Sequence, residues 1–441
     1  MINSIYGRIR NFWRIKFIKD AFTLQIGSVF GTALSFLASI IYARILGPAD
    51  YGVYVLIFSL VSLVGAAESW GEGYALLTLL SAAWGKRDKA EIKSLVLFFI
   101  KISLLEFVFI GLIAFILAPT VSLWLYQNSK IGQLARWILL ANIIQFIFSL
   151  LTIILQSARK IKQLTLLENI NKLVYLIIPV GLVLFGLGLN GIVIGNLLSS
   201  VIFLIFSIYL YSVLAKKTSL LPSIKEIFVG LRGVKITKYL KFSILIAVDK
   251  NLANFYSSLP MVFLGMFVVP ENIAFFKIAF SYVGLSLISL KGVSRLLLVQ
   301  LPKSRIYGMA ELKKHFFKTT IYSVVIVEIV IVPMLLLAKW LVELFYGSDY
   351  SSSVTLIYII WPYVLISAAG VGLGPLFRAL DKVKVAVAIN IISLVVTVPI
   401  FYLMIKNYYL LGMAITVIFS ILIPILLAHL YFLRYFKKLS Q

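Results

Sequence analysis

The sequence contains no cysteine, which excludes disulfide bonds, thiolate metal sites and a cysteine nucleophile. Histidine occurs only twice, at His315 and His429, and these two residues do not make a metal cluster. The chain also lacks a phosphate-binding loop of the form Gly, four residues, Gly-Lys-Ser/Thr, which argues against ATP hydrolysis. We therefore predict that the protein is not an enzyme, and we expect no catalytic residues, no metal site and no cofactor.

Charged residues are scarce as well, at 13% of the 441 residues, against about 25% in soluble domains. Hydrophobic residues make up 62%, and the mean hydropathy is +1.05. Several apolar runs exceed the ~20 residues that a helix needs to cross ~30 Å of hydrocarbon. The alternating ten-residue strands of a membrane β-barrel are missing from the sequence. This composition predicts an all-α polytopic membrane protein.

We predict about 12 transmembrane helices, near residues 21–43, 53–80, 94–117, 134–156, 164–186, 189–213, 242–268, 273–300, 316–338, 354–377, 383–405 and 409–433. The longest connection, residues 214–242, is basic and falls at the midpoint of the chain. It predicts a linker between two six-helix lobes, an N-terminal lobe of residues 1–218 and a C-terminal lobe of residues 219–441.

The two halves resemble each other when the sequence is shifted by 222 residues. The stretch ILGPADYGVY (45–54) then lies over FVVPENIAFF (267–276), and Glu106 falls on Glu328. An even number of spans in each half predicts a parallel repeat, with pseudo-symmetric lobes related by an axis along the membrane normal. Two such lobes enclosing a central site suggest transport by alternating access.

The 41 Lys and Arg residues are distributed unevenly over the predicted connections. Thirty fall in the two termini and in alternate connections, and six lie within spans. Five fall on the opposite side, namely Arg44, Lys130, Arg136, Lys339 and Lys406. The positive-inside rule then predicts a multi-pass protein of the cell (inner or plasma) membrane with both termini in the cytoplasm. Because topology explains the basic charge, we predict no nucleic-acid partner.

The stretch ARILGPADYGVYVLIFSLVSLVGAAESWGEGYALLTLLSAAWGKRDKAEIKSL (43–95) resembles the N-terminal signature of Wzx-type polysaccharide flippases. These flippases belong to the multidrug/oligosaccharidyl-lipid/polysaccharide exporter superfamily. The stretches LGMFVVPENIAFF, VQLPKSR and LLGMAIT (410–416) resemble the corresponding elements of the second half. The resemblance covers nearly the whole chain.

This resemblance implies two six-helix lobes in a V, with spans 1, 2, 7 and 8 facing a central cavity. It also implies export of a polyprenyl-diphosphate-linked oligosaccharide for cell-surface polysaccharide, with a glycan polymerase or glycosyltransferases as candidate partners. A multidrug or small-molecule ion-coupled antiporter of the same superfamily is the alternative. A membrane glycan polymerase or ligase is disfavoured, because such enzymes usually carry a long extracytoplasmic loop with charged and His residues, which this sequence lacks.

Three cations lie in the eighth span, at Lys277, Lys291 and Arg295. At about 100° per residue, positions 291 and 295 fall within about 40° of position 277, so an uninterrupted helix would carry all three on one stripe. Charges in hydrocarbon are costly, whereas a wet cavity that receives a diphosphate would stabilise them. The alternative is that these side chains snorkel to the two membrane surfaces.

Other candidates for the substrate site come from two further spans. Lys250 and Asn254 share a face of span 7. Gln25 and Thr32 belong to a polar stripe on span 1, where they would line the cavity and bind the glycan. A second polar stripe on span 4 runs from Asn142 to Gln156; such stripes of small polar residues usually pack helices together in lipid.

Acidic residues in the spans are candidates for a gate or for coupling to Na+ or H+. Glu68 and Glu72 stand one turn apart, which disfavours ionisation of both. If the lobes are symmetric, they face Lys291 and Arg295 as a gate; partners within one lobe are the alternative. Glu106 and Glu328 are isolated carboxylates in spans 3 and 9, where each serves ion coupling or forms a hydrogen bond to a neighbouring helix.

The charge distribution makes a prediction about topology. Because the native chain has no cysteine, single cysteines report their side of the membrane without background. In intact cells an impermeant thiol reagent is expected to label Asp50→Cys, Ser129→Cys and Ser348→Cys. It is expected to label Asp88→Cys, Ser219→Cys and Lys437→Cys only after permeabilisation. Reversal at any two sites would contradict the topology with both termini inside.

Overall fold

The computed structural model describes the backbone of residues 16–68 and 70–439 and most of their side chains. Nearly all of these residues are helical, and the described part of the chain contains no strand. The helices of the first half are α2 (Lys16–Glu68), α3 (Glu72–Lys86), α4 (Lys89–Glu106), α5 (Leu112–Tyr126), α6 (Ser129–Ile144), α7 (Phe146–Ser157), α8 (Ile161–Leu182), α9 (Gly188–Lys217) and α10 (Ile224–Gly230). Those of the second half are α11 (Thr237–Phe267), α12 (Pro270–Leu285), α13 (Lys291–Ile306), α14 (Met309–Leu336), α15 (Ala338–Tyr346), α16 (Ser352–Ile360), α17 (Pro362–Gly370), α18 (Leu373–Ala379) and α19 (Val383–Leu439).

Short segments of other helix types interrupt this series. Two π-helices are present, η1 (Phe107–Gly111) after α4 and η2 (Val183–Leu187) after α8. Two 3-10 helices are η3 (Ser286–Leu290), between α12 and α13, and η4 (Ser348–Tyr350). Such segments change the direction in which the following side chains point, because their twist per residue differs from that of an α-helix.

Eight helices of the described chain are long and apolar enough to cross a membrane. Some of them are far too long for one crossing, since 53 residues of α2 would extend about 80 Å as a straight helix. The two longest helices bend at a non-helical residue, α2 at Gly47 (φ 71°, ψ 173°) and α19 at Tyr409 (φ 48°, ψ −121°). The predicted all-α polytopic membrane fold is confirmed.

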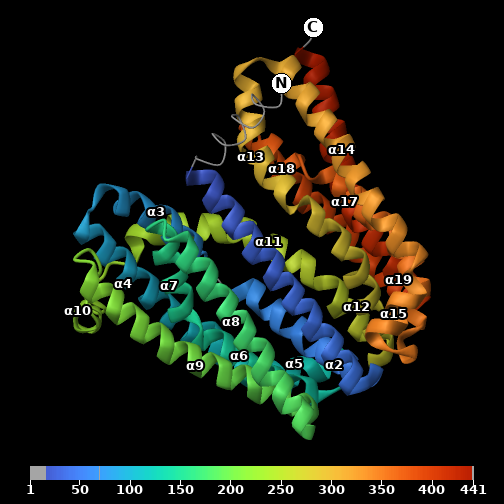
Figure 1. Cartoon of the computed structure of the whole chain (residues 1–441), viewed down its shortest axis with the longest axis horizontal. Helices are drawn as coiled ribbons and strands as arrows, with labels where there is room; N and C mark the ends of the chain where they lie inside the picture. Colours follow the sequence, from blue (N-terminus) through green and yellow to red (C-terminus); the bar gives the residue numbers. More distant parts are fainter. Residues whose placement is uncertain (1–15, 69, 440–441) are drawn as a thin grey trace, which may run out of the picture. The chain divides into compact units, whose positions relative to one another are not determined.

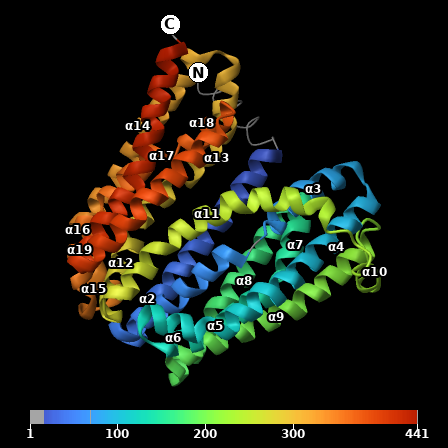
Figure 2. The same ribbon diagram turned by 180° about the vertical axis from the view of Figure 1, so that it is seen from behind.

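The chain forms two compact units. Unit 1 consists of residues 1–45 and 60–255, and unit 2 of residues 46–59 and 256–441. In unit 1, α4, α7, α8 and α9 lie side by side (Figures 1 and 2). In unit 2, α14 and α19 both pack against α17. Two helices, α2 and α11, contribute residues to both units, so each unit is linked to the other through continuous helix.

Each unit has an apolar core of its own. In unit 1 one cluster is built on α3 and α4, and includes Leu80, Phe98 and Ile100, together with Ile227 from the linker helix α10. In unit 2, Phe316 of α14 meets Phe432 of α19 and residues of α18. These clusters bury large side chains, so each unit is stabilised by its own packing.

The segment of α2 that belongs to unit 2 is fixed by a close backbone approach. Gly52 is buried, and a methyl group added to it would collide with the backbone carbonyl of Pro270, the first residue of α12. The neighbouring Tyr51 is 1% exposed and packs edge-on against the ring of Tyr350. A small residue at a helix contact of this kind lets two backbones approach closely.

This contact predicts a loss of stability for Gly52→Ala. The added methyl group has no space, and overpacking of this kind costs about 1–3 kcal/mol, because α2 and α12 must separate. The apparent melting temperature of the purified protein in detergent is therefore expected to fall. Gly181→Ala is the matched control, since a methyl group there meets no atom within 4 Å. Equal melting temperatures for the two variants would contradict the role of Gly52.

Candidate functional site

The second span is broken in its middle, where an uninterrupted helix over residues 53–80 is predicted from the sequence. Helix α2 ends at Glu68, and α3 begins at Glu72. Between them, Gly71 adopts φ 79° and ψ 11°, which lies in the left-handed region that favours glycine. The prediction of a continuous helix is wrong here, because a run of apolar residues indicates a membrane span but does not indicate whether the helix is broken by a turn within it.

The backbone groups at the break are held by side chains of two other helices. The Trp70 N–H donates to Oε1 of Glu106 at 2.7 Å, and the Trp70 carbonyl accepts from Oγ of Ser243 at 2.5 Å. Gly71 packs directly on α11, since a methyl group there would collide with the backbone at Ser243 and Ala247. Within a bilayer an unwound backbone needs such partners, because no water replaces the lost helical hydrogen bonds.

Glu106 lies at the end of α4, directly before the π-helix η1. π-helices are rare and frequently accompany functional sites, because their extra residue re-aims the neighbouring side chains. The residue stands near the middle of an apolar helix that spans Lys89–Tyr126. A carboxylate is therefore placed inside a membrane-spanning segment and accepts a backbone hydrogen bond there.

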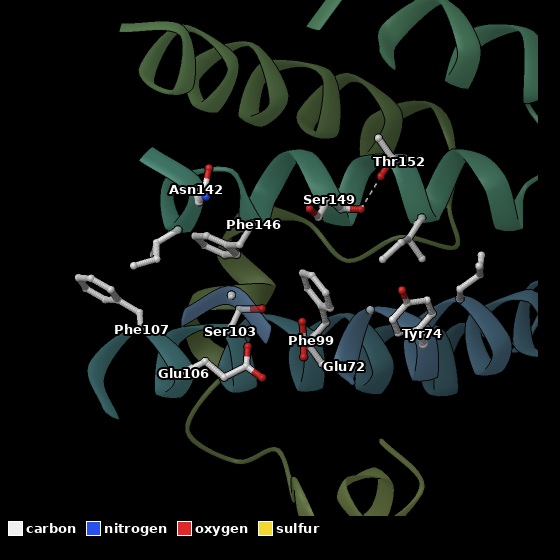
Figure 3. A pocket seen from close by; sticks show the side chains of 15 residues that line it. Glu72, Tyr74, Phe99, Ser103, Glu106, Phe107, Asn142, Phe146, Ser149 and Thr152 are labelled. Atoms are coloured by element: carbon white, nitrogen blue, oxygen red, sulfur yellow. Dashed lines mark hydrogen bonds between the residues drawn. The ribbon is translucent and has the colours of Figure 1, made fainter. Parts of the chain in front are cut away.

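A cavity of about 470 Å³ opens beside this carboxylate within unit 1. Figure 3 shows its two walls. One wall, from α3 and α4, carries Glu72, Ser103 and Glu106, and the opposite wall, from α6 and α7, carries Asn142 and Ser149. The described residues that line the cavity include two carboxylates and no lysine or arginine. The lining is mostly apolar, but its charged groups are acidic, and the cavity offers oxygen ligands to a cation.

The polar stripe on span 4 contributes to this cavity. Asn142, Ser149 and Thr152 line it, although the sequence interpretation favoured tight helix packing for the stripe. The helix is interrupted at Gln145 (φ −75°, ψ −1°), where α6 ends and α7 follows. The side chain of Thr152 donates to the carbonyl of Ser149 at 2.8 Å (Figure 3).

The structure brings two of the four predicted acidic residues to one site. Glu72 and Glu106 both line the cavity. Glu328, which matches Glu106 in the sequence repeat, is exposed on the surface of α14. Glu68 lies at the end of α2, and its side chain is outside the described residues. The predicted gate between Glu68, Glu72 and the cations of span 8 stays a prediction.

The predicted cations belong to both units. Lys250 lies on α11 in unit 1, and Lys291 and Arg295 lie on α13 in unit 2; the side chains of all three are outside the described residues. Lys277 of α12 is half-buried, and no described carboxylate lies within ion-pair distance of its ammonium group. Asn254 is exposed on α11.

Span 8 is interrupted as well, by the 3-10 helix η3 at residues 286–290. A 3-10 helix turns about 120° per residue instead of about 100°, so five residues add roughly 100° of rotation between positions 277 and 291. With this rotation, positions 291 and 295 fall about 60° and about 100° from position 277, so the backbone spreads the three cations over about 100° in place of about 40°. The stripe stays a prediction, because the side chains of Lys291 and Arg295 lie outside the described residues. Shifted by the repeat of 222 residues, η3 falls on residues just before the break in span 2.

The two polar residues predicted on span 1, Gln25 and Thr32, differ in their hydrogen bonding. The amide oxygen of Gln25 is buried and has no hydrogen-bond partner among the described residues. Thr32 donates to the carbonyl of Ser28 in its own helix at 2.8 Å. Gly27 and Gly31 on the same helix leave room for Thr165 and Lys172 of α8, so this face of α2 packs against α8.

Solved structures of other proteins share the fold of this chain. The structure of an inward-facing multidrug resistance MATE family transporter of the MOP superfamily has a TM-score of 0.76 and 17% identity, and the match covers 93% of this chain and 95% of the other. A MOP superfamily transporter from Pyrococcus furiosus, described as having a binding pocket of reversed polarity, has a TM-score of 0.64 and 18% identity over 96% of both chains. The fold is that of MOP superfamily transporters.

Sequence comparison identifies the family. The profile of the family described as "Polysaccharide biosynthesis protein" matches residues 41–355, and the chain belongs to this family. A curated relative, the "Probable low-salt glycan biosynthesis flippase Agl15" of Haloferax volcanii, is 20% identical over 423 residues. That match covers 96% of this chain and 84% of the relative.

The contact between Glu106 and Trp70 predicts different effects for two substitutions. Glu106→Ala leaves the Trp70 N–H without its acceptor, which costs about 1–3 kcal/mol and lowers the apparent melting temperature. Glu106→Gln keeps an oxygen that accepts this hydrogen bond, so its loss is expected to be smaller. Glu328→Ala, at the exposed repeat position, is the control and is expected to leave the melting temperature unchanged. Equal losses for Glu106→Ala and Glu328→Ala would contradict this role.

Proposed function

We propose that the protein flips a polyprenyl-diphosphate-linked oligosaccharide from the cytoplasmic to the outer leaflet by alternating access. The observation that carries this proposal is the family match over residues 41–355. The relative named as a probable glycan biosynthesis flippase and the MOP-type fold support it. Such a protein is a transporter of the cell membrane, and it moves its substrate without breaking a bond in it.

The diphosphate of this substrate needs cationic partners. Lys277 supports their presence in unit 2, because it is half-buried and none of the described carboxylates neutralises it. We assign the phosphate contacts to Lys250, Lys277, Lys291 and Arg295, since charge-assisted hydrogen bonds to phosphate oxygens are strong. The glycan hydroxyl groups need polar partners, and Asn254, Gln25 and Thr32 are assigned to them. The buried amide oxygen of Gln25 has capacity for such a hydrogen bond.

The acidic cavity of unit 1 is assigned to energy coupling with H+ or Na+. Either cation would compete with the Trp70 N–H for the carboxylate oxygens of Glu106. Loss of that hydrogen bond would loosen the break between α2 and α3. Helix α2 continues from this break into residues 46–59, which belong to unit 2, so a change at Glu106 has a covalent route to the other unit. Glu72 shares the cavity, and Glu68 and Glu328 are kept as further candidates from the sequence.

The arrangement of the chain in the membrane follows from the same proposal. Residues 1–218 and 219–441 are assigned as the two repeats, and both termini are assigned to the cytoplasm. A glycan polymerase or glycosyltransferases on either side of the flipping step are the expected protein partners. They supply the finished lipid-linked glycan or consume it.

An ion-coupled antiporter of small molecules is the second candidate function. The observation that favours it is the acidic cavity, because Glu72 and Glu106 would also attract a cationic drug. The two candidates differ in the sign of the substrate charge. A lipid-linked diphosphate needs the cations of α11, α12 and α13, whereas a cationic drug does not.

Transport measurements test the proposal. Purified protein in proteoliposomes is expected to move a fluorescent polyprenyl-diphosphate oligosaccharide between leaflets. Lys250→Gln and Lys291→Gln each remove a charge-assisted contact worth about 1.5–3 kcal/mol, so the transport rate is expected to fall by about tenfold or more. Lys339→Gln, an exposed lysine on a different connection, is the control.

Folded protein in the membrane is expected to stay at the native level in all three variants. Normal transport by Lys291→Gln would show that this lysine snorkels to the membrane surface. Transport of cationic dyes by the native protein, without movement of the lipid-linked glycan, would establish the antiporter instead.

A further inference from the structure

The linker between the two halves of the sequence, residues 218–236, packs against helix α4. Nζ of Lys93 lies 3.4 Å from Oε1 of Glu226, and Nζ of Lys101 donates to the carbonyl of Val234 at 3.1 Å. Between these two contacts, a methyl group on Gly230 would lie 2.7 Å from the side chain of Leu97. Both partners advance in steps of four residues, so the linker runs parallel to α4 over two turns.

These contacts set the depth of the linker relative to the membrane. Leu97 and Lys101 lie within the helix Lys89–Tyr126, which is long and apolar enough to cross a bilayer. Leu97 is eight residues, or about 12 Å, from the start of that helix. The linker also connects the end of α9 at Lys217 to the start of α11 at Thr237. It is therefore held at the edge of the membrane-spanning region.

The short helix α10 in this linker is two-sided. Ile227 is buried against the core of unit 1. Phe228 and Val229 point the other way and are 73% and 74% exposed. Lys225 is also exposed, and at about 100° per residue it falls between Phe228 and Val229 on the same face. Arg232 follows one turn later and is exposed too.

The outward face of the linker carries positive charge only. Glu226 is the single acid in residues 218–236, and it is held by contacts within the fold. Its carboxylate accepts from the backbone N–H of Ser223 and forms an ion pair with Lys93. The hydrogen bonds from Ser223, followed by that from Lys93, lower the pKa of Glu226 to about 2. Glu226 is thus ionised and paired at neutral pH, and it does not offset Lys225, Arg232 and Lys235.

We propose that α10 docks on the bilayer surface, with Phe228 and Val229 at the boundary of headgroups and acyl chains and Lys225, Arg232 and Lys235 on anionic phospholipid headgroups. This arrangement of apolar tips flanked by cations is typical of interfacial helices. Basic segments next to membrane spans are attracted to the anionic lipids of the cytoplasmic leaflet, the side that the charge distribution predicts for this linker. A bilayer fits better than a protein partner, because the contact with Leu97 already holds α10 at the membrane edge.

Spin labels on single cysteines test this docking in the full-length protein, which has no native cysteine. The protein is reconstituted into vesicles of mixed phosphatidylcholine and phosphatidylglycerol. Labels at Phe228→Cys and Val229→Cys are expected to be more accessible to oxygen than to a water-soluble nickel complex. A label at Ser219→Cys, exposed in the same linker, is the control and is expected to show the reverse.

The role of charge is tested separately. The combined variant Lys225→Gln, Arg232→Gln and Lys235→Gln is expected to move the label at Phe228→Cys toward water, as are vesicles of phosphatidylcholine alone. The matched control removes three exposed charges elsewhere, with Lys130→Gln, Lys339→Gln and Lys406→Gln, and is expected to leave the label in place.

Three results would overturn the proposal. Nickel accessibility at position 228 equal to that at 219 would show that α10 does not touch the bilayer. If the label at position 228 inserts equally well without anionic lipid and in the variant lacking the three charges, the cations do not contact the headgroups. Labels that are water-exposed in vesicles but protected in native membranes would mean that a protein covers this face.

Discussion

Every backbone N–H and C=O inside a bilayer needs a partner from the protein, and the break at Trp70 depends on this rule. An apolar helix satisfies the rule by itself, but a turn in its middle releases donors and acceptors into hydrocarbon. Glu106 and Ser243 supply the missing partners from two other helices. The positions of α4 and α11 around the break follow from this requirement, and so does the placing of a carboxylate near the middle of an apolar span.

The interruptions of span 2 and span 8 lie beside residues of opposite charge. At the shift of 222 residues, the 3-10 segment at residues 286–290 falls on residues 64–68, directly before the break around residue 70. Discontinuous helices at corresponding positions of two halves are the strongest pointer to the working part of a repeat transporter. In unit 1 the interruption lies beside carboxylates. In unit 2 it directly precedes Lys291, in the same span as the half-buried Lys277.

The membrane fold could be predicted from the sequence because it rests on averages over many residues. Twenty apolar residues in a row indicate a spanning helix, whatever their order, and charge outside the spans indicates topology. The repeat also left a readable pattern, since Pro48 matches Pro270 at the shift of 222 residues. Composition and spacing were sufficient for the spanning helices, whereas the topology and the repeat stay predictions.

The candidate site could be predicted only in part, because it depends on single turns. Glu106 was identified as an isolated carboxylate, but its partner is a backbone N–H that has no sequence signature. The motif Trp70-Gly71 did carry a signal, since a glycine in the middle of a span permits the left-handed conformation observed there. The width of the stripe on span 8 could not be predicted for a related reason, because five residues of 3-10 helix rotate everything beyond them.

The repeat positions Glu106 and Glu328 show why symmetry of sequence does not imply symmetry of role. Both residues are glutamates in apolar helices, yet Glu106 lines a cavity and accepts a hydrogen bond, whereas Glu328 is exposed on its helix. The position that matches Trp70 in the second repeat is Gly292, which follows η3 inside a helix. Because η3 is followed directly by helix α13, fewer backbone N–H and C=O groups lose their helical hydrogen bonds there than at Trp70. The second half therefore has less need of a carboxylate as a hydrogen-bond acceptor at this position. This difference agrees with the proposed division of roles, in which a proton or a sodium ion acts on unit 1 and Lys277 of unit 2 contacts the anionic substrate.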